Sequence, residues 1–172
     1  MKTIFASLMF LVFSAVAAEY PACDVRQLRK VPLLIQGEQA ELEVKIKGAP
    51  CYQATLELNV LAHGKTAYSY KAPFKPHVAI EWKDINEQAA IEYAERTYSA
   101  VYFKNCDELL PAVLGSDDIY NYHTILVPAP VYAQYKASQC RAFEHQIHYE
   151  ASRDVVFPQN TSEGIAVSEF GL

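Results

Sequence analysis

The stretch AELEVKIK at residues 40–47 decides the fold class, because apolar and charged residues alternate along it without interruption. Successive side chains of a β-strand point to opposite faces, so this run predicts a strand with one buried and one solvent-facing side. A glycine and a proline at residues 48–50 end the run. A second alternating run covers residues 52–62, and a turn at 63–65 leads to a third predicted strand at 66–71. Together they predict an antiparallel meander.

Residues 85–96 repeat apolar side chains at spacing four, with Asp84 in the N-cap position and Glu87 three residues later, which predicts a helix. Further strands are predicted at 31–35, 77–82, 98–104, 119–127, 140–151 and 155–157, short helices at 107–114 and 131–137, and irregular chain at 19–30. The strands come in runs rather than alternating with helices. The sequence therefore predicts an α+β domain, with an antiparallel sheet of five to seven strands packed against one main helix.

The first 18 residues, MKTIFASLMFLVFSAVAA, are typical of a secretory signal peptide, with Lys2, an apolar run and a small-x-small site ending at Ala17. The run is too short to span a bilayer. We therefore expect a periplasmic or secreted protein, cleaved after Ala17 or Ala18, with no transmembrane segment left after cleavage. The predicted organisation is a signal peptide at 1–18, a single α+β domain at 19–157 and a flexible C-terminal tail at 158–172.

The cysteine count is even, which in an exported chain predicts two disulfides. Four cysteines can be connected in three ways. We favour the connectivity with two local disulfides, because each of them closes a short loop. On the chain-entropy model each would stabilise the fold by roughly 3–4 kcal/mol. The favoured pairs are Cys23–Cys51 and Cys106–Cys140.

The formal net charge of −5 at pH 7 narrows the class of partner. A nucleic-acid-binding protein is expected to carry a basic face, so the charge argues against such a partner. An acidic protein is steered toward a basic one, which favours a basic protein of the cell envelope.

Five histidines raise the question of a metal or acid-base site, and the sequence HQIH at 145–148 holds two of them. Residues three apart on a strand point to opposite faces, so His145 and His148 cannot share an ion there, whereas His148 and Glu150 lie on one face. The candidate metal set is His145, His148 and Glu150. No H-E-x-x-H motif, nucleophile elbow or glycine-rich phosphate loop is present. The sequence therefore predicts no cofactor and no catalytic residue, and favours a protein that is not an enzyme.

Twelve tyrosines are the most unusual feature of the composition. Two proline-bounded loops lie next to some of them in the sequence. Tyrosine gives broad apolar contact with a polar tip, which suits recognition surfaces, although most such rings are half-buried in a core. Stiff loops lose little entropy on contact. The candidate ligand-binding residues are Tyr68, Tyr70, Phe74, His77, Tyr120, Tyr122, Tyr132 and Tyr135.

These features favour a non-catalytic binding protein of the periplasm or secreted space, in one version an inhibitor or immunity protein against a basic cell-envelope hydrolase. Two alternatives stay open. One is a small hydrolase or metal-binding protein that uses His123, His145 and His148. The other is an envelope assembly component that pairs through a strand edge.

Overall fold

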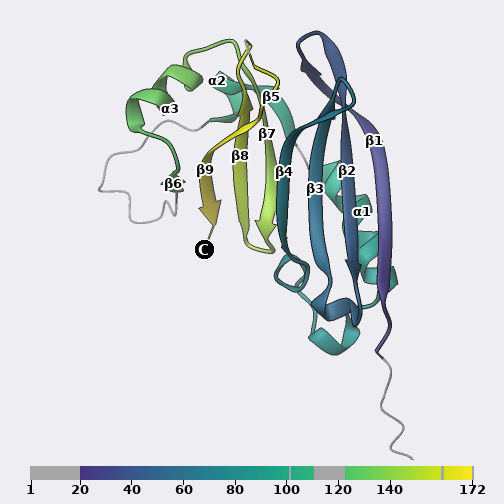
Figure 1. Ribbon diagram of the computed structural model, residues 1–172. Coiled ribbons are helices and arrows are strands. Elements are labelled where there is room, and N and C mark those ends of the chain that lie inside the picture. Colours follow the sequence, from purple (N-terminus) through teal and green to yellow (C-terminus); the bar gives the residue numbers. More distant parts are fainter. Residues whose placement is uncertain (1–19, 101, 111–122, 160, 172) are drawn as a thin grey trace, which may run out of the picture.

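Two antiparallel sheets build the fold in the computed structural model, which describes residues 20–100, 102–110, 123–159 and 161–171 (Figure 1). Sheet A has the strand order β1-β2-β3-β4 and sheet B the order β5-β7-β8-β9-β6. The strands of sheet A are β1 (Cys23–Ile35), β2 (Glu38–Gly48), β3 (Thr55–Ala62) and β4 (Lys65–Pro73). Those of sheet B are β5 (Tyr102–Asn105), β6 (His123–Ile125), β7 (Arg141–His148), β8 (Ala151–Phe157) and β9 (Ile165–Gly171).

Three α-helices accompany the sheets within the described residues. The sequence predicts one main helix at 85–96 and short helices at 107–114 and 131–137, and a helix of the structure overlaps each of these ranges. The three helices are α1 (Glu87–Ala100), α2 (Cys106–Leu109) and α3 (Ala129–Lys136), and single 3-10 turns lie at η1 (Cys51–Gln53), η2 (Lys75–His77) and η3 (Trp82–Asp84). Antiparallel pairing, the meander and two disulfides are thus confirmed. The prediction of one sheet is wrong, because the chain between β4 and β5 forms helices and turns and the later strands pair only with one another. None of the helices in the described ranges is long and apolar enough to cross a bilayer.

Two hairpins of sheet A close through two-residue turns. Gln36 and Gly37 join β1 to β2 with φ of 49° and 83°, and His63 and Gly64 join β3 to β4 with φ of 51° and 69°. Two successive positive φ values define the turn that matches the twist of antiparallel strands, and glycine adopts the second without steric cost. The predicted turn at 63–65 is confirmed. His63 Nδ1 lies 2.5 Å from a carboxylate oxygen of Glu38, which ties the two hairpin tips together.

The inner face of sheet A is covered by two different partners along its length. Toward the β1–β2 turn it packs against sheet B, where Leu42 and Val60 belong to the same buried cluster as Phe143 and Phe157. Toward the start of β1 it packs against α1, through a cluster that includes Ile46, Leu56, Phe74, Tyr93 and Ala94. The opposite face of sheet B is covered by α2 and α3. Because sheet B and α1 share one side of sheet A, the boundary between them is where a groove can form.

Both favoured disulfide pairings are confirmed. Cys23–Cys51 links the first residue of β1 to η1, and Cys106–Cys140 links α2 to the residue before β7. All four cysteines are buried. Each bridge therefore fixes one end of a sheet.

Several predicted elements differ from the structure. Residues 19–30 are not irregular where they are described, because β1 begins at Cys23. The predicted strand at 77–82 is wrong: His77 belongs to η2, and its side chain is buried with Nδ1 3.0 Å from the carbonyl oxygen of Pro73. The predicted strand at 140–151 ends at His148 and is followed by a turn into β8.

The C-terminal tail predicted as flexible is wrong over its second half. Residues 165–171 form β9, which pairs with β8 and β6 and buries Val167 and Ser168 completely. Ile165 and Ala166 before them are partly buried. The predicted signal peptide at 1–18, Tyr120 and Tyr122 lie outside the described residues. So does the part of the predicted strand at 119–127 that precedes residue 123, and β6 covers 123–125 of the remainder.

Candidate functional site

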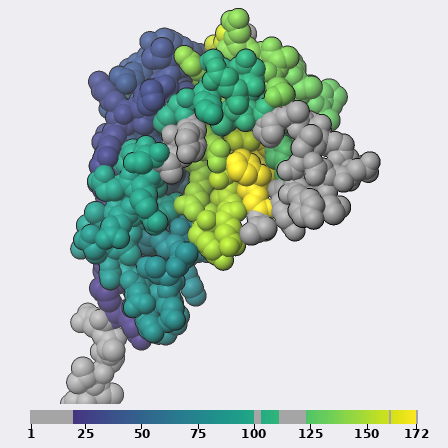
Figure 2. Space-filling model, turned by 180° about the vertical axis from the view of Figure 1, so that it is seen from behind, coloured from purple at the N-terminus to yellow at the C-terminus, as the bar shows by residue number. Residues whose placement is uncertain are grey.

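A groove of about 450 Å³ lies between α1 and the β7–β8 hairpin. Figure 2 shows the face on which α1 (teal) and this hairpin (lime green) lie next to each other. Side chains of both signs, amides, hydroxyls and aromatic rings line it. The lining residues are Tyr93, Arg96, Thr97, Glu144, His145, Gln146, His148, Tyr149, Glu150, Ala151 and Ser152.

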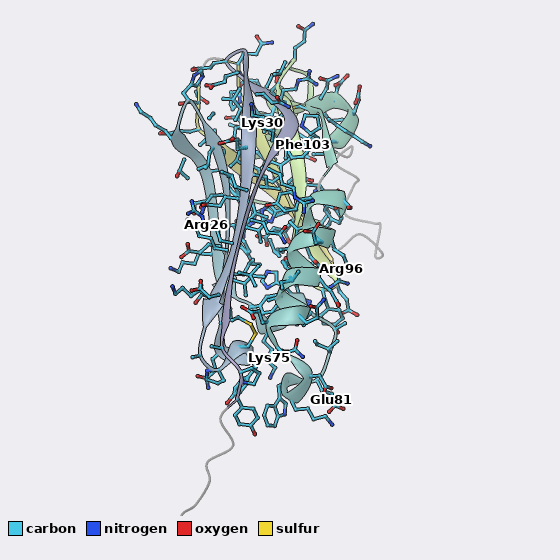
Figure 3. The ribbon with its side chains drawn as sticks, turned by 90° about the vertical axis from the view of Figure 1, so that its right-hand side faces the viewer. Arg26, Lys30, Lys75, Glu81, Arg96 and Phe103 are labelled. Carbon is cyan, nitrogen blue, oxygen red and sulfur yellow. A yellow bond between two sulfur atoms is a disulfide. The ribbon has the colours of Figure 1, made fainter. Side chains whose placement is uncertain are left out.

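The wall from α1 is set by helical spacing. Tyr93 and Thr97 stand one turn apart on the buried side of the helix, and the Thr97 hydroxyl donates to the Tyr93 carbonyl oxygen at 2.9 Å. Burial raises the pKa of Tyr93 far above its usual value, so its phenol stays neutral. Arg96, labelled in Figure 3, lies between them in sequence and brings a permanent cation to this wall.

The opposite wall is the β7–β8 hairpin, whose turn is anchored to sheet A. The backbone N–H of Tyr149 donates to the carbonyl oxygen of Pro76 in η2 at 2.9 Å. Tyr149 itself is 45% exposed. Its hydroxyl bonds the Glu150 carboxylate, and this bond raises the pKa of Tyr149. The turn therefore holds a tyrosine ring and a carboxylate at the mouth of the groove in a fixed position.

Two buried histidines lie beneath the groove and both are neutral. His145 Nδ1 lies 3.0 Å from the Gln146 carbonyl oxygen, which can only accept, so Nδ1 carries the hydrogen and Nε2 accepts from the Tyr68 hydroxyl at 2.9 Å. Burial lowers the pKa of His145 to about 3. His77 repeats the pattern, with Nδ1 donating to Pro73 and Nε2 3.2 Å from the Tyr70 hydroxyl, and burial lowers its pKa as well.

The same cluster joins the two sheets. The Tyr70 hydroxyl on β4 donates to the Ile147 carbonyl oxygen on β7 at 3.1 Å. The guanidinium of Arg153 on β8 lies 5.2 Å from the centroid of the Tyr70 ring and bonds the Glu169 carboxylate on β9 at 2.8 Å through Nε. Both ring nitrogens of His145 and the Nδ1 of His77 are engaged in hydrogen bonds, so this cluster supports the groove and leaves recognition to the side chains at its walls.

The predicted ligand-binding residues fall into two groups. The first group lies together in the fold and consists of Tyr68, Tyr70, Phe74 and His77. Three of these residues are buried, so they support the groove and do not form its surface: Tyr68, Phe74 and His77. Tyr132 is fully buried and Tyr135 half-buried behind sheet B, in the separate cluster covered by α3. The predicted tyrosine surface is therefore not a single face within the described residues.

The predicted metal and hydrolase sets are not assembled. Both ring nitrogens of His145 are occupied, and His148 Nδ1 lies 3.4 Å from the backbone N–H of Glu150, a bond within the turn. His123 lies on β6, separated from β7 by two strands of sheet B. Across the described part of the chain, no three side chains of His, Cys, Asp or Glu gather closely enough to hold a metal ion.

Sequence reasoning missed most of the groove. The sequence places Tyr93 and Arg96 in a predicted amphipathic helix, where nothing marks them as binding residues. It places Glu144, Gln146 and Tyr149 in one long predicted strand. The turn at 149–150 uses tyrosine and glutamate, which carry no strong turn signal. The nearest available clue was the density of titratable residues at 144–150.

Comparisons with known proteins give this chain no family: no family model matches it, and neither the curated proteins nor the solved structures contain a significant match.

Proposed function

We propose that the protein is an exported, non-catalytic binding protein, and that the groove between α1 and the β7–β8 hairpin takes a basic group of its partner. The observation that carries the proposal is that Glu144 and Glu150 line one groove together with the exposed ring of Tyr149. Carboxylates pair with a cation, and aromatic faces attract it.

The charge of the whole chain supports the same class of partner. Two carboxylates against Arg96 leave the groove walls with an excess of negative charge, and the chain as a whole carries −5. A lysine or arginine side chain of a basic envelope hydrolase fits this sign, and the Arg96 cation offers a counterpart for a neighbouring acidic or carbonyl group. In this version the protein acts as an inhibitor or immunity protein.

The rigid support makes the groove suitable for recognition. The hairpin is held by the Tyr149–Pro76 bond, and the buried Tyr70 and His145 contacts fix β7 against β4. A preformed site loses little conformational entropy when it binds. The same contacts occupy both ring nitrogens of His145, the buried histidine that lines the groove, which favours binding over catalysis.

The test uses a basic lysozyme-type muramidase as the probe, with its rate of cell-wall lysis and its dissociation constant measured at low salt. We expect inhibition by the natural chain, and at least about tenfold weaker binding for the double variant Glu144→Gln/Glu150→Gln.

A matched control has the same change of net charge away from the groove. Asp107→Asn/Glu163→Gln alters two exposed carboxylates, on α2 and before β9, neither of which lines the groove. This variant should inhibit as the natural chain does. Equal loss in both double variants would show that only overall charge matters, and no binding of the muramidase by the natural chain would overturn the proposed partner.

A further inference from the structure

The outer face of sheet A, which points away from α1 and sheet B, carries a hollow of about 380 Å³ that we call the outer hollow. Four cations line it, although the chain as a whole carries a net charge of −5. Two carboxylates and a threonine complete its polar lining. These residues are Asp24, Arg26, Lys45, Lys47, Thr55, Glu57 and Lys71. In Figure 3 the labelled Arg26 lies on the side of sheet A that faces away from α1.

The strand register places like charges side by side in the outer hollow. Arg26 on β1 lies directly opposite Lys45 on β2, and Lys47 follows two residues later on the same face of the sheet. Like charges directly opposite each other in an antiparallel pair are destabilising. Residues that oppose the stability of a fold in this way are expected at sites of function. The three neighbouring cations therefore indicate a place where an anion binds.

A buried carboxylate holds two of these cations in place. Glu43 is 3% exposed, its Oε1 accepts from Arg26 Nε at 2.8 Å, and its Oε2 lies 2.7 Å from Lys45 Nζ. Asn59 Nδ2 donates to the same Oε2 at 3.1 Å, and the Ser69 hydroxyl donates to Asn59 Oδ1 at 2.7 Å. One carboxylate thus serves two cations, which leaves an excess positive charge. Arg26 Nη2 also contacts Glu43, so Nη1 is the guanidinium nitrogen that has no acceptor among the described residues.

The other two ion pairs of the outer hollow are exposed. Lys47 Nζ lies 3.2 Å from Asp24 Oδ2, and these side chains are 76% and 71% exposed. Lys71 Nζ lies 2.6 Å from Glu57 Oε1, and the Lys71 side chain is 66% exposed. Exposed ion pairs contribute little to stability, so an incoming anion can take over these two ammonium groups at small cost.

We propose that the outer hollow binds the phosphate group of a small phosphorylated molecule. Such a group carries close to two negative charges and three acceptor oxygens, so it can pair with Arg26, Lys45 and Lys47 at once, whereas a carboxylate has one charge and two oxygens. Asp24 and Glu57 on the same face repel a continuous anionic surface such as a membrane, which favours a single group. The proposal is independent of the groove, because no residue lines both.

The test is an NMR titration of the isotope-labelled protein with inorganic phosphate, at an ionic strength held constant with sodium chloride. We expect saturable amide shifts at residues 24–26 and 45–47. The variant Lys47→Gln/Lys71→Gln removes two cations whose partners are surface carboxylates and leaves the buried Glu43 network intact, so it should fold as the natural chain does. Its dissociation constant for phosphate should be at least about tenfold higher.

Lys65→Gln/Lys83→Gln is the matched control, because it removes two exposed lysines that do not line the outer hollow. Its affinity for phosphate should equal that of the natural chain. Shifts that do not saturate, or an equal loss of affinity in both double variants, would overturn the proposal, because phosphate would then act only through overall charge. Binding of phosphatidylglycerol vesicles without any response to inorganic phosphate would also overturn it, because this face would then recognise a membrane surface.

Discussion

Burial decides the charge of the individual histidines beneath the groove. His145 is 1% exposed and His77 is 2% exposed. Both ring nitrogens of His145 and the Nδ1 of His77 are hydrogen-bonded inside the protein. Low solvation disfavours the imidazolium, which is why the pKa of His145 lies near 3. His145 therefore stays neutral over the range in which an exposed histidine titrates, and burial lowers the pKa of His77 in the same direction.

This burial makes stability depend on pH. In the unfolded chain His145 takes up a proton near pH 6.5, whereas in the folded chain it does so only near pH 3. The unfolded state binds more protons between these values, so the free energy of unfolding falls as pH drops below about 6.5. We expect chemical denaturation of His145→Gln to show a weaker fall between neutral pH and pH 4. Parallel curves for the two proteins would contradict this.

Asp154 should make the free energy of unfolding change with pH in the opposite direction. It is 1% exposed, its Oδ2 accepts from the Ser168 hydroxyl at 2.6 Å, and its Oδ1 has no hydrogen-bond partner among the described residues. Burial raises its pKa to about 6 from 3.8. Protonated Asp154 stabilises the fold fully at pH values below 3.8, the pKa of this group in the unfolded chain. That stabilisation is lost as pH rises through about 6, the pKa in the folded chain.

The neutral substitution Asp154→Asn tests this directly. Its stability relative to the natural chain should rise by about 2 kcal/mol between pH 4 and pH 7, because the carboxyl of the unfolded chain is already partly ionised at pH 4 and that of the folded chain ionises only near pH 6. Urea denaturation at both pH values measures the difference. A relative stability that is the same at the two values would show that Asp154 is ionised without cost.

At the scale of secondary-structure elements, each disulfide fixes one end of a sheet. Cys106–Cys140 closes a separation of 34 residues and joins α2 to the start of β7. Replacing both cysteines by serine should lower the free energy of unfolding by roughly 3–4 kcal/mol, because the unfolded chain gains freedom. Denaturation of the Cys106→Ser/Cys140→Ser variant, compared with the natural chain under non-reducing conditions, gives the value. An unchanged midpoint would show that this bridge is dispensable.

The elements of sheet A could be predicted because their sequence repeats match their structure. Residues 40–47 alternate strictly and form most of β2, and the glycine at 64 fits the positive φ of its turn. The helix predicted at 85–96 is confirmed as α1, displaced by a few residues. Local periodicity sufficed in these places, since one face of each element is buried.

Other elements depend on long-range pairing that the sequence does not reveal. β9 is stabilised by β8 and β6, so its seven residues read as a tail when considered alone. The division into two sheets follows from which strand edges meet, and no local signal specifies that. The groove joins residues 93–97 of α1 to residues 144–152 of the β7–β8 hairpin, which are remote in sequence, so the site escaped prediction. The residues at 68–77 that the sequence offered as ligand-binding residues form its support instead.

Considered as a whole molecule, the acidic chain should bind a basic partner in a salt-dependent manner. Long-range attraction raises the association rate, and salt screens it over about 8 Å at physiological ionic strength. We expect the association rate with the muramidase, measured by surface plasmon resonance, to fall by roughly tenfold from low to physiological salt. A rate independent of salt would contradict charge steering, whether or not the complex forms.

The most direct test of the groove as the binding site is amide chemical-shift mapping by NMR of the isotope-labelled chain on titration with the unlabelled muramidase. The account predicts that the largest shifts fall at residues 93–97 on α1 and 144–152 on the β7–β8 hairpin. Shifts concentrated on the outer face of sheet A or around Trp82, with these two segments unmoved, would contradict it.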